Sequence, residues 1–144
     1  MVDILSLPHG LPFLFLDRIE EIVPGERGTF IIQWSFGGHY QSAQAPPSFS
    51  QALMLEAMAE AAGLILLAEE SGKGWQGSPR GYLLRLDRVS FNSWPRAGEE
   101  IRLSLTQKKH LGNLVLFSGE AYCEKRLLGR ADLTLWHGGG EEGN

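Results

Sequence analysis

The stretch MLEAMAEAAGLILLAEE, from Met54 to Glu70, decides the fold of this chain. Its apolar residues wrap most of the way round a helical projection instead of forming one stripe, which indicates a helix buried on nearly all sides. Ser48 precedes Gln51 by three residues, as in a capping box, so we expect the helix to run from about Phe49 to Glu70. Such a helix needs a curved sheet around it, because a flat sheet cannot cover its whole surface.

Glu56 is the unusual residue of this helix. An ionised carboxylate left unpaired in a protein interior is costly, so this one needs either a structural hydrogen-bond partner or a chemical task. Glu60 lies one turn further along and shares its face. Glu60 either shares a proton with Glu56 or forms an ion pair with an arginine of the covering sheet, and we favour the ion pair because buried charges are usually paired. The candidate arginines are Arg85 and Arg88.

The segments on either side of the helix read as strands. Residues 15–23 and 28–35 flank a turn at Pro24-Gly25 and predict a hairpin. After the helix, four strand-like segments joined by short turns predict an antiparallel meander. They cover residues 82–91, 100–108, 114–123 and 127–136. The predicted class is α+β, a curved antiparallel sheet wrapped around one long helix, with a single domain over residues 1–137 and a disordered Gly/Glu tail over 138–144.

Composition excludes several classes of protein. The 144 residues carry a formal net charge of −4, which argues against a nucleic-acid-binding module. A single cysteine, Cys123, allows no internal disulfide and no metal cluster, and in its strand it reads as a small buried hydrophobe. The first apolar run lacks the preceding basic residues of a secretory signal, and the run Leu64–Ala68 is far shorter than the roughly 20 residues of a membrane span. We expect a cytoplasmic protein without membrane insertion.

Three motifs occur in a recognisable order. They are LPHGLPFLFLDRIEEIVPG (7–25), LEAMAEAAGLI (55–65) and VSF followed by PRAGEEIRLSL (89–105). With these motifs the chain resembles the bacterial β-hydroxyacyl-acyl-carrier-protein dehydratases, which have the hot-dog fold. The resemblance covers about residues 5–136. It implies a hydro-lyase of fatty acid biosynthesis that removes water from a β-hydroxyacyl thioester carried on acyl carrier protein or CoA. It also implies a homodimer or a trimer of dimers, and we expect no cofactor and no metal.

The resemblance assigns roles to individual residues. In the family a histidine from the partner subunit removes the proton alpha to the thioester carbonyl, and the helix carboxyl helps expel the hydroxyl as water. Backbone N–H groups at the helix start hold the thioester oxygen. Glu56 matches the helix carboxyl by position, and Gln51 matches the glycine of the oxyanion site. Phe49, Met54 and Leu83 are candidates to line an acyl tunnel.

The motif that carries the family histidine is altered in this chain. The corresponding stretch is GGHYQSAQAPPSFSQALMLE, residues 37–56, and counting back from Glu56 places Ser42 at the histidine position. His39 lies three residues earlier, whereas a serine cannot serve as the base without one beside it. Either a rebuilt loop brings His39 into the site or the base is absent. Absence would indicate a non-catalytic subunit that binds acyl chains or partners an active dehydratase. A third possibility is a hot-dog thioesterase in which Glu56 activates water.

Overall fold

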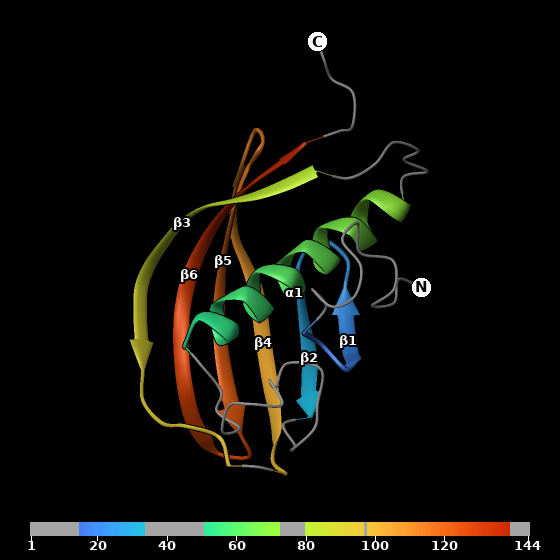
Figure 1. The fold of residues 1–144 in the computed structure, drawn as a ribbon. Helices are drawn as coiled ribbons and strands as arrows, with labels where there is room; N and C mark the ends of the chain where they lie inside the picture. The colour runs from blue at the N-terminus through green and yellow to red at the C-terminus, as the bar shows by residue number, and fades with distance from the viewer. Residues whose placement is uncertain (1–14, 34–50, 73–79, 97, 139–144) are drawn as a thin grey trace, which may run out of the picture.

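The structure, a computed structural model, describes residues 15–33, 51–72, 80–96 and 98–138. Its elements are β1 (Arg18–Val23), β2 (Arg27–Gln33), α1 (Gln51–Gly72), β3 (Arg80–Phe91), β4 (Glu100–Leu111), β5 (Leu114–Cys123) and β6 (Arg126–Gly138). The strands form one six-stranded antiparallel sheet, and α1 crosses one face of it diagonally (Figure 1). This confirms the predicted α+β class with one central helix.

The predicted hairpin before the helix is confirmed. β1 and β2 pair antiparallel and turn at Gly25, whose φ of 71° lies in the left-handed region that favours glycine. The turn packs against α1, because the backbone N–H of Gly25 donates to the carbonyl of Ile65 at 3.2 Å. A side chain at Gly25 would begin 2.7 Å from the carboxyl carbon of Glu69. The backbone angle therefore favours glycine here, whereas the Glu69 carboxylate is the end of a flexible side chain and could move aside.

The prediction of a four-strand meander after the helix is wrong for β3. The sheet order is β1-β2-β4-β5-β6-β3, so only β4, β5 and β6 follow one another as neighbours. Tight turns at Gly112-Asn113 and Glu124-Lys125 force those three to pair in sequence order. The longer connection after Phe91 passes the ends of β6 and β5 instead, and it leaves β3 at the edge (Figure 1). This crossover places the end of β3 beside the start of α1.

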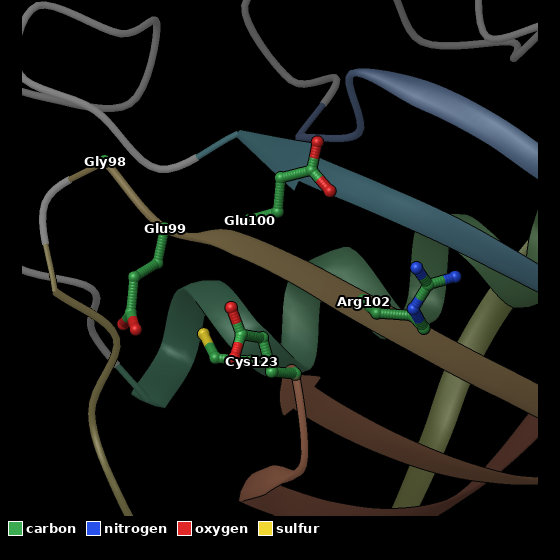
Figure 2. A pocket seen from close by; sticks show the side chains of 6 residues that line it. Gly98, Glu99, Glu100, Arg102 and Cys123 are labelled. Carbon is green, nitrogen blue, oxygen red and sulfur yellow. The ribbon is translucent and has the colours of Figure 1, made fainter.

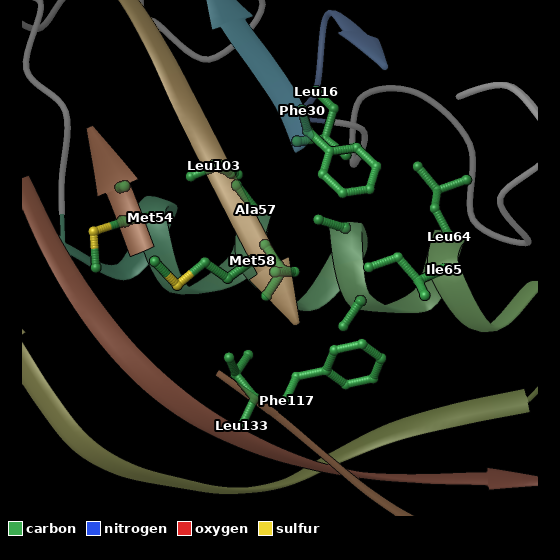
Figure 3. Packing of buried hydrophobic residues seen from close by; sticks show 14 of the residues in the cluster. Leu16, Phe30, Met54, Ala57, Met58, Leu64, Ile65, Leu103, Phe117 and Leu133 are labelled. Carbon is green, nitrogen blue, oxygen red and sulfur yellow. The ribbon is translucent and has the colours of Figure 1, made fainter. Parts of the chain in front are cut away.

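The core lies between α1 and the sheet. Strand residues alternate between the helix-facing side and the opposite side, as in β5, where every second residue from Val115 to Cys123 is buried. Side chains of α1 point into the same layer from the other side (Figure 3). Burial of each large apolar side chain contributes about 1.5–3 kcal/mol. The layer includes Phe30, Met54, Met58, Ile65, Leu103, Phe117 and Leu133.

The helix is less completely covered than its sequence predicts. Residues 64–68 are all buried, as expected. Nearer the start, Gln51, Ala52 and Glu56 are exposed, and Ala59 and Gly63 continue this open stripe as partly buried positions. The expectation of burial on nearly all sides is therefore wrong for the first half of α1.

The length and hydropathy of α1 would also suit a membrane span. The candidate window covers Gln51–Glu69, and 56% of it is buried inside the fold. In this structure the segment is the core helix of the domain, which accounts for its apolar composition.

Candidate active site at the start of the central helix

Three elements meet at the start of α1. They enclose a small apolar hollow. It is lined by Gln51 and Met54 from the helix, by Leu128 from β6, and by the end of β3 with the residues after it. Its free volume is about 10 Å³, the room of about one water molecule. The residues contributed by the end of β3 and the connection after it are Phe91, Ser93 and Trp94. Their presence could not be read from the sequence, because only the β3–β6 pairing brings them to the helix.

Glu56 does not lie in the protein interior in the single chain. Its side chain is exposed on the open stripe of α1, two residues beyond the buried Met54. One chain by itself therefore does not supply the interior setting that the apolar neighbours of Glu56 suggest. The sheet covers the opposite side of the helix, so a water-poor setting for this carboxylate requires a second surface laid over the open stripe.

Among the helix residues whose burial the structure describes, the buried carboxylate is Glu60. It is 4% exposed, and its Oε1 accepts a hydrogen bond of 2.8 Å from the backbone N–H of Phe15. The favoured ion pair with Arg85 or Arg88 is wrong, because both arginines lie on exposed surface and contact aspartates of the sheet. Glu60 thus holds the chain where it enters β1.

The other predicted residues are separated in the single chain. Met54 is 1% exposed and lies over Gly129 of β6, where an added Cβ would be 3.0 Å from its sulfur and its methyl carbon. Leu83 is 40% exposed on β3 and pairs with Leu135. Leu135 is about 20 Å along β6 from Gly129 at the usual rise per residue. One chain therefore does not bring Met54 and Leu83 to a common tunnel. Phe49, His39 and Ser42 lie outside the described residues.

A larger hollow of about 370 Å³ lies between the start of β4 and the β5–β6 turn. Figure 2 shows Glu99, Glu100, Arg102 and Cys123 around it. Burial, followed by the nearby Glu99 carboxylate, raises the pKa of the Cys123 thiol to about 11, so the thiol stays protonated at neutral pH. Glu100 and Arg102 are engaged in ion pairs with residues of β1. The interpretation of Cys123 as a buried hydrophobe is confirmed. The described residues around this hollow include no activated nucleophile.

Beside this hollow, Glu99 forms an ion pair with Arg126 of β6, with Oε1 at 2.7 Å from Nη2. The hydrogen bond from Arg126, followed by one from the backbone N–H of Arg96, lowers the pKa of the Glu99 carboxyl to about 2. Because the folded-state pKa is depressed, the stabilisation is complete above the ordinary value of 4.5 and is lost only as the pH falls toward 2. The pair is therefore intact throughout the neutral range.

Among solved structures, the chain resembles the dehydratase heterocomplex ApeI:P from Xenorhabdus doucetiae. The TM-score is 0.83, the alignment covers 96% of this chain and 92% of the other, and 16% of the aligned residues are identical. A likeness at this identity concerns the fold, and it confirms the predicted hot-dog fold.

Sequence comparison identifies the family. The model of the FabA-like domain matches residues 7–132. A 3-hydroxyacyl-acyl-carrier-protein dehydratase FabZ from Campylobacter lari is 30% identical over 142 residues, covering 92% of this chain and 95% of the relative. The FabZ of Rhizorhabdus wittichii is 33% identical over 131 residues, covering 90% of this chain and 82% of the relative. The resemblance noted from the motifs is confirmed: the chain belongs to the FabA-like family.

Proposed function

We propose that the protein is a 3-hydroxyacyl-acyl-carrier-protein dehydratase that eliminates water from a β-hydroxyacyl thioester in fatty acid biosynthesis. The observation that carries this proposal is the match to relatives with that name along about nine-tenths of the chain. The placement of Glu56 and Gln51 near one end of the helix supports it, since an elimination needs an acid close to donors for the thioester oxygen.

The reaction divides among three groups. A base takes the proton from the carbon alpha to the thioester carbonyl, and that electron pair becomes the new C=C bond as the bond to the β-hydroxyl breaks. Glu56 in its protonated form donates to the departing hydroxyl, so water leaves and a trans-2-enoyl thioester remains. Backbone N–H groups at Gln51 and the next residues hold the thioester oxygen as negative charge develops. The candidate for the base is His39, which lies outside the described residues and would come from a second subunit.

A second copy of the chain is the proposed cover for the open stripe of α1. β3 is a long edge strand, and its backbone groups on the outer side can pair with another strand. Apolar side chains along it are exposed to a degree that isolated edge strands normally avoid. They are Tyr82 (55%), Leu83 (40%), Leu84 (56%), Val89 (37%) and Phe91 (37%). We propose a two-fold homodimer through β3, alone or within a trimer of dimers, in which Leu83 and Glu56 become covered.

The proposed substrate is an acyl thioester carried on acyl carrier protein, with CoA as the alternative carrier. The proposed place of action is the cytoplasm, which agrees with a single buried thiol and no disulfide among the described residues.

The test is turnover of a 3-hydroxyacyl carrier thioester by the purified protein, followed as formation of the enoyl product. We expect Glu56→Gln and His39→Ala each to lower kcat by about 100-fold or more, the usual scale of acid–base catalysis. Glu56→Gln should still fold, as checked by circular dichroism, because no contact within one chain buries this side chain. Glu21→Gln, an exposed carboxylate on β1, is the matched control and should keep full activity.

Two results would overturn the proposal. A wild-type protein that binds the acyl carrier thioester without turnover would be a non-catalytic acyl-binding or partner subunit. Release of a free 3-hydroxy acid in place of the enoyl thioester would make it a thioesterase.

A further inference from the structure

We propose that Arg126 is a positioning residue that holds residues 91–94, here called the crossover wall, against the start of α1 and thereby sets the affinity of the site for its acyl group. This inference rests on the proposed function, because it deepens the description of the same site. The crossover wall supplies Phe91, Ser93 and Trp94 to the hollow that Gln51 and Met54 line from the helix.

The backbone of the crossover wall is fixed on one side by β6. The ladder between β3 and β6 ends at the pair Phe91 and Gly129. Beyond it, the carbonyl of Leu128 accepts hydrogen bonds from the N–H of Asn92 at 2.7 Å and of Ser93 at 3.2 Å. These two bonds hold the first half of the wall, and they leave Trp94 to be held by something else.

Arg126 holds the second half. Its Nε donates to the hydroxyl of Ser93 at 3.1 Å, and its Nη2 donates to the carbonyl of Trp94 at 3.0 Å. The guanidinium is itself fixed by two hydrogen bonds to Glu99, at 2.7 and 3.3 Å, and Glu99 accepts a bond of 2.6 Å from the N–H of Arg96. A planar guanidinium suits this task because its donors point in fixed directions, whereas a lysine offers one charged centre on a flexible stem.

The position of Trp94 depends on this backbone anchor. The residue is 56% exposed, so packing alone does not fix its ring. If Arg126 is removed, the Ser93 hydroxyl and the Trp94 carbonyl lose their hydrogen bonds while the core between α1 and the sheet stays in place. A loosened wall weakens contact with the acyl group in the ground state and the transition state alike. Such a loss of uniform binding raises KM and leaves kcat nearly unchanged.

The test compares two arginines of the same strand. Arg126→Met removes the anchor but keeps the apolar stem, and we expect KM to rise about tenfold with kcat within about threefold of wild type. The KM of Arg126→Lys should lie between that of the wild type and that of Arg126→Met. The matched control is Arg130→Met, because Arg130 pairs only with Glu120 at 3.3 Å among the described residues, and it should keep the wild-type KM.

A double-mutant cycle separates positioning from general loosening of the fold. Trp94→Ala removes the ring that the wall presents, and we expect it to raise KM as well. If Arg126 acts through Trp94, then Arg126→Met should add little in the Trp94→Ala background. Additive effects of the two changes would overturn the inference.

Two readouts do not depend on turnover. Arg126→Met should speed hydrogen exchange at the amide of Ser93, whose hydroxyl loses its bond to the guanidinium. It should also weaken binding of an unreactive amide analogue of the 3-hydroxyacyl thioester about tenfold. If the wild type has no turnover, the proposed function fails, yet these two measurements still decide the inference. Unchanged exchange together with unchanged analogue binding would overturn it. If Arg126→Met does not fold, Ser93→Ala and Arg126→Lys carry the same test.

Discussion

At the scale of the residue, Glu56 and Glu60 differ in burial, although the sequence suggests an interior position for both. Glu56 and Glu60 lie one turn apart, about 40° around the helix axis at the usual residues per turn. That small angle is enough for Glu56 to be exposed on the open stripe while Glu60 is buried where the chain enters β1. A backbone donor binds Oε1 of the buried Glu60, and we propose that a second subunit covers Glu56.

The hydrogen bond from Phe15 to Glu60 makes a prediction about stability. Glu60→Ala leaves this partly buried amide without the 2.8 Å acceptor and should lower the free energy of unfolding by about 1–3 kcal/mol. Glu60→Gln keeps an accepting oxygen in the same place and should lower the free energy of unfolding by clearly less. Urea unfolding of the three proteins checks this. Equal losses in both variants would mean that the charge of Glu60, and not its accepting oxygen, stabilises the fold.

At the scale of the element, the helix lies close to the sheet because glycines leave room for methionines. An added Cβ at Gly119 of β5 would be 3.0 Å from the sulfur of Met58, and one at Gly129 of β6 would be equally close to that of Met54. The flexible thioether side chains fill these positions in the layer that Figure 3 shows. The start of α1 thereby comes within reach of the crossover wall.

Gly129 should be the less tolerant of substitution, because its neighbour is backbone. A Cβ there would lie 2.7 Å from the carbonyl oxygen of Ser90, so Gly129→Ala should force β3 and β6 apart at a cost of about 1–3 kcal/mol. Gly63→Ala is the control, since nothing lies within 4 Å of its added Cβ and alanine favours a helix by roughly 0.5–1 kcal/mol. The midpoint temperature of thermal unfolding should fall for Gly129→Ala and rise for Gly63→Ala. A neutral Gly129→Ala would contradict this close approach.

At the scale of the whole molecule, a single chain is an incomplete version of the proposed site. Glu56 is open to solvent, and Leu83 lies on an edge strand. Met54 is enclosed over Gly129, six residues along β6 from Leu135, the partner of Leu83. A copy paired along β3 would cover the exposed apolar side chains of that strand and would provide the surface that the carboxylate lacks.

The proposed dimer can be broken at its strand. Leu84→Lys places a charge on an exposed apolar position of β3, so we expect a shift from dimer to monomer in sedimentation and a loss of turnover in parallel. Leu111→Lys adds the same charge at a leucine that is 61% exposed at the end of β4, and it should leave the assembly unchanged. A Leu84→Lys protein that remains dimeric would place the interface elsewhere.

Local patterns in the sequence determined the helix, the hairpin and the strands on either side, because a period of 3.6 or 2 is set by neighbouring residues. The motifs determined the family, since their order and spacing occur within one chain. Only the tertiary structure decided that β3 leaves the meander and that Glu60 is the buried acid, and only it brought Arg126 to Ser93 and Trp94. These outcomes depend on which surfaces cover one another over long sequence separations, and such contacts leave no periodic mark in the chain.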